Sequence, residues 1–155
     1  MIARGCVPFV ALLLVAADQP AKDAAKEDRD KLQGEWVMVS VELPPKVRKP
    51  DEEQIKRSGL VVKDDTWQMI TNGKEASKMP FTIDPTKDPK EIDFKVKIGE
   101  GVKVKGGNEF TLKGIYKLDG DTLTLCRTVL GTDDRPKEFK AGEVLLAVYK
   151  RKEKK

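Results

Sequence analysis

Four carboxylates gathered around two prolines come nearest, in residue type and spacing, to catalytic chemistry. They are Asp84, Asp88, Glu91 and Asp93, which flank Pro85 and Pro89. Two carboxylates held close together can act as general acid and base, and carboxylate oxygens are also the ligands that calcium prefers. However, aspartate beside proline is ordinary turn chemistry, lysines alternate with these acids, and no calcium-loop spacing is met. We therefore expect a structural corner here, with no catalytic residue and no metal site.

The residue types that are missing narrow the chemistry further. The 155 residues contain no histidine and two cysteines. The lack of histidine excludes Ser-His and Cys-His nucleophile systems and histidine-ligated zinc or iron, and one cysteine in a mature chain excludes a thiolate zinc site. No glycine-rich loop is followed by the helix and lysine that phosphate binding requires. We expect a protein that is not an enzyme and carries no cofactor.

The stretch 110–127 carries the most specific structural signal, because two runs of alternating apolar residues flank Asp119 and Gly120. This pair is typical of a two-residue type I′ turn between antiparallel strands. The implied register pairs Tyr116 with Leu123 and collects nearly all large apolar side chains on one face. A hairpin with one apolar face is not stable alone in water, so further strands must cover it.

Two neighbouring residues at the end of this hairpin lie on opposite faces. Arg127 falls on the apolar face, where it either meets an anionic group of a ligand, reaches solvent or pairs with an acid. Cys126 falls on the other face and is either a buried small hydrophobe under a covering segment or a reactive or intermolecular thiol. Since the other cysteine, Cys6, lies in the apolar N-terminal run, we expect no internal disulfide.

The rest of the chain reads as short strands separated by turn signals, which is the all-β pattern. Strands are predicted at 36–43, 60–63, 66–71, 75–83, 91–98 and 144–150, in addition to the two arms of the hairpin. Asp51 and Gln54 form a capping box at the start of a short helix that Gly59 would end. About eight antiparallel strands can close into a small barrel, although a two-sheet sandwich would also satisfy the alternation.

The two ends of the chain differ from this body. Residues 1–17 have the pattern of a secretory signal, with Arg4 before an apolar run too short to cross a bilayer of ~30 Å. A cleaved signal is favoured, with an uncleaved anchor as the alternative. Residues 18–31 form a polar leader, either mobile or a solvated helix, the domain spans 32–151, and 152–155 is a basic tail. The net charge of +4 comes with no basic stripe interleaved with aromatics, so we expect no nucleic-acid partner.

Four short motifs occur in order: LQGEW at 32–36, the Asp-Pro pairs within 84–93, the hairpin residues 114–126, and RPKEF at 135–139. Together they resemble the uncharacterised planctomycete lipocalin-like domain family. The resemblance covers nearly all of the mature chain and implies a small, often exported barrel without an assigned activity. Gly34 and Trp36 are also similar to the first-strand signature of lipocalins. That similarity implies that Trp36 closes the barrel floor, with Lys150 or Arg151 packed across its ring.

We therefore expect a small antiparallel lipocalin-like β-barrel of about eight strands with one short helix, exported to the periplasm or the extracellular space, and monomeric. The candidate function is binding of a small hydrophobic or amphipathic ligand inside the barrel. The candidate lining residues share the apolar face and are Trp67, Met69, Phe94, Val96, Phe110, Leu112, Tyr116, Leu123, Leu125 and Arg127. Because the same residues would also fill a solid core, the alternative is a module that binds a protein or the cell envelope without a ligand.

Overall fold

The computed structural model describes residues 19–45, 49–97, 108–129 and 133–153, so the predicted signal peptide at 1–17 lies outside the described residues. The helices and strands in chain order are α1 (Gln19–Leu32), β1 (Gly34–Glu42), α2 (Glu52–Lys56), β2 (Gly59–Lys63), β3 (Thr66–Thr71), β4 (Lys74–Asp84), β5 (Glu91–Lys97), β6 (Glu109–Asp119), β7 (Thr122–Arg127) and β8 (Leu145–Arg151). No helix in these ranges is long and apolar enough to cross a membrane.

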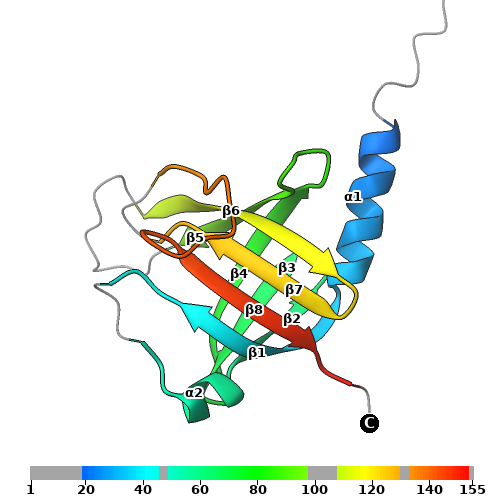
Figure 1. Cartoon of the computed structure of the whole chain (residues 1–155). Helices are drawn as coiled ribbons and strands as arrows, with labels where there is room; N and C mark the ends of the chain where they lie inside the picture. Colours follow the sequence, from blue (N-terminus) through cyan, green and yellow to red (C-terminus); the bar gives the residue numbers. More distant parts are fainter. Residues whose placement is uncertain (1–18, 46–48, 98–107, 130–132, 154–155) are drawn as a thin grey trace, which may run out of the picture.

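The strands form a closed antiparallel barrel in which each strand pairs with the next one along the chain and β8 pairs with β1 (Figure 1). The predicted all-β barrel of eight strands is therefore confirmed, and the sandwich is excluded. Because β8 pairs with β1, neither of these two strands is left as the edge of an open sheet. The interior is filled by alternate residues of each strand, as the period of two requires.

Three aromatic rings form the centre of the core. Trp67 of β3 meets Phe81 of β4 and Phe94 of β5 edge to face, with ring centroids 5.7 and 5.1 Å away. These rings are almost fully buried, as are Leu123 and Leu125 from the hairpin opposite. Edge-to-face packing aligns the positive ring edge with the negative ring face, which adds to the apolar burial.

The predicted hairpin is present, but its register is two residues away from the prediction. Asp119 pairs with Thr122 and Tyr116 pairs with Leu125, so the two turn residues are Gly120 and Asp121. Gly120 has φ +57° and occupies the first turn position, as in a type II′ turn, rather than the second position of a type I′ turn. A shift of two residues leaves every side chain on its predicted face, because the strand period is two.

Gly59 was predicted to end the short helix, and this prediction is wrong. The capping box of Asp51 and Gln54 is confirmed, but α2 ends at Lys56. Gly59 is instead the first residue of β2, where a Cβ atom would lie 2.1 Å from the main-chain oxygen of Trp36. Only glycine lets β1 and β2 come this close, so its role is strand packing and not helix termination.

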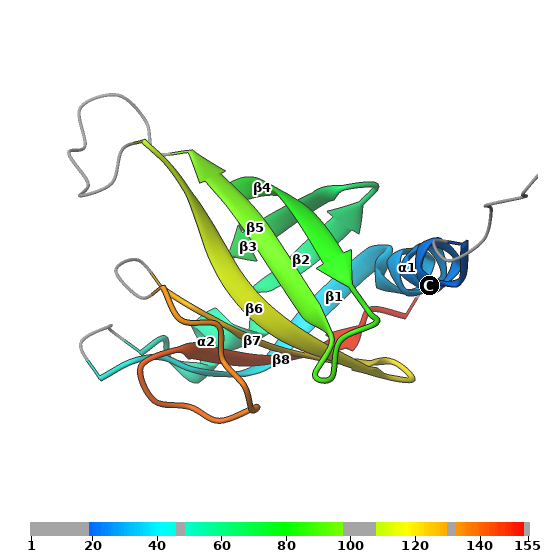
Figure 2. The same cartoon turned by 90° about the horizontal axis from the view of Figure 1, so that it is seen from above.

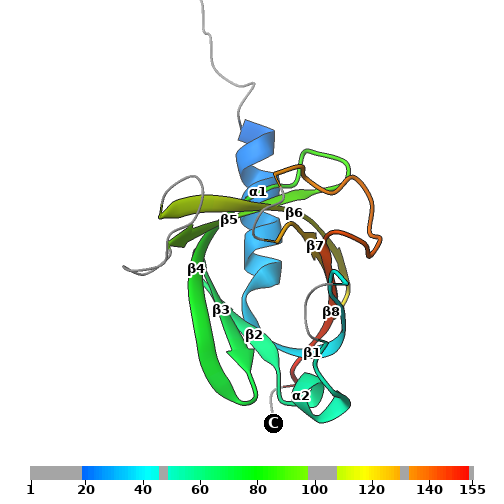
Figure 3. The ribbon, with the colours of Figure 1, turned by 90° about the vertical axis from the view of Figure 1, so that its left-hand side faces the viewer.

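The two ends of the barrel are covered differently. The polar leader forms α1, which packs across the end that contains the β2–β3 and β6–β7 turns (Figures 1 and 2). Leu32 of α1 is fully buried in the core, and Arg29 pairs with Asp65 of the β2–β3 turn. We call this the α1 end and the opposite one, beside α2, the α2 end. Figure 3 looks into the barrel from the α2 end, with α1 behind it.

Candidate functional site

The ten candidate lining residues all face the barrel interior, but they separate into two groups. Six are buried in the packed core: Trp67, Phe94, Leu112, Tyr116, Leu123 and Leu125. The other four are half-buried and lie near the strand ends at the α2 end: Met69, Val96, Phe110 and Arg127. The interior is thus a solid core toward α1 and less completely covered toward α2. A ligand site inside the barrel would have to use the second group.

At the α1 end, Trp36 and Arg151 make the contact implied by the lipocalin resemblance. The guanidinium carbon of Arg151 lies 4.2 Å from the centroid of the Trp36 ring, and the ring nitrogen of Trp36 donates a 2.9 Å hydrogen bond to the Leu32 carbonyl. Gly34 has φ +114°, and a Cβ atom there would lie 3.4 Å from Arg151 Nη1. Of the two basic residues considered, Lys150 is exposed and Arg151 makes the contact. These residues close the barrel at the α1 end.

A buried polar cluster that the sequence analysis missed joins α1 to the barrel. Asp28 is 5% exposed, and its Oδ2 atom accepts hydrogen bonds from the Tyr116 hydroxyl at 2.7 Å and from Lys90 Nζ at 2.6 Å. Burial, together with the hydrogen bond to the Asp28 carboxylate, raises the pKa of Tyr116. Asp28 looked like one of many charges in a polar leader, because nothing local distinguishes it from its exposed neighbours.

Arg127 is the charged member of the lining group. It lies at the end of β7 on the same face as Leu123 and Leu125, and its Nη1 atom donates a 3.1 Å hydrogen bond to the Thr128 carbonyl. Within the described ranges no carboxylate lies at ion-pair distance from it. Burial lowers the pKa of Arg127, although the guanidinium keeps its charge at neutral pH. A guanidinium withdrawn from water without a carboxylate is a preformed site for an anion.

Tyr149 of β8 is a second interior residue that the sequence analysis did not single out. Its ring is almost fully buried. Burial raises the pKa of Tyr149 to about 12, while the positive charge of Arg127 acts in the opposite direction. Both side chains belong to the interior face of the barrel, and a neutral phenol can donate a hydrogen bond. The alternation of β8 pointed Tyr149 inward, but nothing in the sequence linked it to Arg127.

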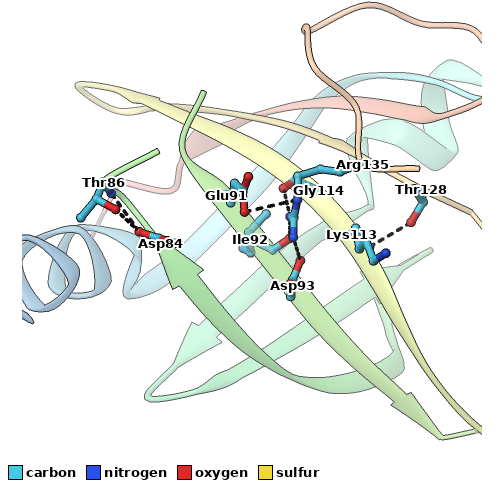
Figure 4. Close-up of polar contacts among 9 residues, drawn as sticks. All are labelled: Asp84, Thr86, Glu91, Ile92, Asp93, Lys113, Gly114, Thr128 and Arg135. Atoms are coloured by element: carbon cyan, nitrogen blue, oxygen red, sulfur yellow. Dashed lines mark hydrogen bonds and ion pairs between the residues drawn. The ribbon is translucent and has the colours of Figure 1, made fainter. Parts of the chain in front are cut away.

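The acidic cluster of the corner has a structural role (Figure 4). Arg135 lies across the outer face of β5 and β6, with Nη2 2.7 Å from Asp93 and Nε 3.3 Å from Glu91. Its Nη1 atom donates to the main-chain oxygens of Gly114 at 2.7 Å and Ile92 at 3.3 Å. These contacts tie the segment that follows β7 to the barrel wall.

The other acids of the corner do not join Glu91 and Asp93 in a site. Asp84 accepts hydrogen bonds from the backbone and the hydroxyl of Thr86, and this hydroxyl contact lowers the pKa of Asp84. Asp88 is exposed. No group of three or more potential metal ligands occurs among the described residues. The corner is therefore built as a turn and an arginine clamp.

Cys126 is buried on the outer face of β7, beneath the segment held by Arg135. It pairs with Ile115 in the ladder, not with Lys113 as the predicted register implied, and its Sγ atom lies 3.9 Å from the Lys140 carbonyl oxygen. Burial raises the pKa of the Cys126 thiol, so the thiolate form is disfavoured. Between the two interpretations considered, the geometry supports a small buried hydrophobe.

Comparisons of the chain with models of protein families, with curated proteins and with solved structures found no match. The functional argument therefore depends on the site itself, because a barrel of this kind is compatible with many functions.

Proposed function

We propose that this protein is a non-enzymatic carrier that holds a small amphipathic anion in the α2 half of its barrel. The observation that carries the proposal is Arg127, which faces the interior without a carboxylate partner among the described residues. A charge that is partly withdrawn from water without a partner is costly, and paired charges are the rule in protein interiors. A ligand carboxylate would supply the missing partner.

The apolar residues of the α2 half support a ligand with an aliphatic part. Met69, Val96 and Phe110 are half-buried and pack against the closed core, so an aliphatic chain placed on them would remove further apolar surface from water. Tyr149 provides a buried, neutral hydroxyl on the same interior face of the barrel. A few polar groups within an apolar lining are typical of sites for small amphipathic molecules.

The proposed setting follows from the sequence pattern. Residues 1–17 resemble a secretory signal, and the four motifs resemble an exported lipocalin-like family. We place the carrier in the periplasm or outside the cell, acting as a monomer. A carrier of this kind needs no catalytic group, which agrees with the lack of histidine in the chain.

The test combines recovery of the natural ligand with a matched pair of variants. Native mass spectrometry of the protein purified from its own host should show a reproducible additional mass that is lost on denaturation. Fluorescence titration with cis-parinaric acid, a straight-chain carboxylate, should show saturable binding that Arg127→Met weakens by about 10–100-fold, the equivalent of a charge-assisted hydrogen bond. Arg57→Met is the control, since Arg57 is an exposed arginine at the end of α2.

A second candidate function is supported by the outer face of β1. Val37 and Val39 are 37% and 50% exposed, on the same strand and face. Exposed apolar residues that lie together favour a protein-binding surface. Three results together would replace the carrier proposal by this interaction module. The folded protein would carry no additional mass and would not bind cis-parinaric acid. It would associate with an envelope fraction, and Val39→Lys would abolish that association.

A further inference from the structure

The barrel wall is split between β4 and β5 on the side of the α2 end. The ladder between them contains four pairs, from Asp84 with Glu91 to Phe81 with Phe94, and ends there. Beyond this point β4 continues to pair with β3, and β5 continues to pair with β6. Pro80, the next residue of β4, has no N–H group to extend the ladder. In Figure 3, β5 and β6 accordingly run away from β3 and β4.

A hollow of about 440 Å³ occupies this split, within the roughly 300–1,000 Å³ typical of small-molecule sites. Its lining comes from β4, β5 and β6 and consists of Lys78, Pro80, Lys95, Val96, Lys97, Glu109, Phe110 and Thr111. Val96 and Phe110 face the barrel interior, whereas the lysines alternate with them and face outward. The hollow therefore joins the outer surface to the same apolar side chains that line the proposed ligand site.

The charge around the hollow is positive. Lys78 pairs with Glu75 at 3.0 Å and Lys97 pairs with Glu109 at 2.7 Å, so these two lysines are neutralised. Lys95 also lines the hollow and acts on the same Glu109 carboxylate through its charge, without an ion pair among the described residues. Three lysines and one glutamate in this lining leave an excess of positive charge over apolar side chains, which complements an anionic head group on an aliphatic chain. The free edge of β4 is unsuited to pairing with an added peptide strand, because it carries two lysines and a proline: Lys74, Lys78 and Pro80.

We propose that this split is a side entrance to the barrel. A single-chain aliphatic carboxylate enters between β4 and β5, Lys95 attracts its carboxylate, and Val96 and Phe110 lead its chain toward Arg127. This inference depends on the proposed carrier function and adds the route and the class of ligand.

The test is stopped-flow mixing of the full chain with cis-parinaric acid, together with equilibrium titration. Lys95→Glu should lower the association rate constant roughly threefold or more at low salt, and the difference should vanish at high salt, because steering by exposed charge is screened. Lys150→Glu is the control, since Lys150 is an exposed outward residue of β8, on the far side of the barrel, and changes the net charge equally.

A steric variant tests the route independently of charge. Thr111→Trp places a large side chain into the hollow from an exposed position of β6. It should slow association and dissociation by the same factor and leave the Kd within about twofold, since an obstacle on the route alters the barrier and not the bound state.

The outcomes separate the two proposals. Binding with wild-type rates in both variants would overturn the entrance and leave the carrier intact. A change in Kd without a change in the association rate would also overturn it, because Lys95 would then belong to the bound state. Absence of any saturable binding by the wild-type protein would overturn the carrier proposal and the entrance with it.

Discussion

Three arginines face different environments in this small barrel, and their partners determine their roles. Arg135 is held by two carboxylates and two main-chain oxygens. Arg151 contacts the Trp36 ring, the Asp121 carboxylate and the carbonyls of Lys31 and Gln33. Among the described residues, Arg127 donates one hydrogen bond, to the Thr128 carbonyl. Because five donors of a guanidinium need acceptors, Arg127 retains the capacity to bind an anion.

Arg151 should be required for stability in a way that its neighbour Lys150 is not. Its planar guanidinium stacks on Trp36 while donating to the carbonyls of Gln33 at 2.8 Å and Lys31 at 2.5 Å, which an ammonium cannot do at the same time. We expect Arg151→Lys to lower the free energy of unfolding by about 1–3 kcal/mol.

Urea denaturation measures this effect, with Lys150→Met as the matched control. Lys150 is exposed, so its replacement should change the free energy of unfolding by less than about 0.5 kcal/mol. Equal effects of the two variants would show that the contact with Trp36 contributes nothing specific.

At the scale of elements, the packing of α1 against the barrel is the feature that the sequence did not predict. It has no continuous apolar stripe, yet Leu32 enters the core and Asp28 is buried against β6 and the β4–β5 corner. Its attachment therefore depends on a few specific contacts and not on a broad apolar face. An element held in this way should respond strongly to a single substitution.

We expect Asp28→Ala to loosen α1, because it leaves the Tyr116 hydroxyl buried without an acceptor and removes the partner of Lys90. The free energy of unfolding should fall by about 1–3 kcal/mol. Hydrogen exchange should show lost protection of the α1 amides before that of the barrel. Asp23→Ala is the control on the exposed side of α1, and unchanged protection of α1 in Asp28→Ala would contradict the prediction.

At the scale of the whole molecule, the barrel divides into a closed half and a split half. Aromatic packing, α1 and the Trp36–Arg151 contact complete the α1 end. The wall opens between β4 and β5 toward the α2 end, where Arg127 and the half-buried apolar residues lie. The closed half supplies the stability that allows the other half to be incompletely packed.

The buried tyrosines predict a loss of stability in alkali. An unfolded chain ionises tyrosine near pH 10, whereas Tyr149 keeps its proton in the fold until about pH 12, and the pKa of Tyr116 is also raised. Between these values the unfolded state binds fewer protons, so the free energy of unfolding falls as pH rises, by about 1.4 kcal/mol per pH unit for each tyrosine.

Urea denaturation at intervals of about half a pH unit, from about pH 8 to about pH 11.5, measures how the free energy of unfolding changes with pH. Tyr149→Phe removes one of the two groups and should make the decline shallower, while Lys and Arg titrate equally in both proteins. An unchanged slope in Tyr149→Phe would show that this phenol is not responsible.

Local pattern was sufficient to predict much of the architecture. Alternation assigned the strands and their inward faces, and the capping box of Asp51 and Gln54 placed the start of α2. Asn72 and Gly73, with φ of +53° and +74°, form the tight turn between β3 and β4, as expected of residue types that tolerate positive φ. The predicted hairpin register differs from the observed one by two residues. Gly120 suits either turn position, and registers that differ by two residues bury the same face.

The order of residue types specified about eight strands, their interior face and the inward direction of Arg127, since these depend on a period of two that neighbours in sequence display. The alternation left a sandwich open, and closure into a barrel was decided by the tertiary structure. Tertiary structure alone decided which partners those residues meet. Asp28 was joined to Tyr116 across 88 positions, and β4 was separated from β5 halfway along their length. The burial of Asp28 arises from segments that are distant in sequence, and no local pattern encodes it.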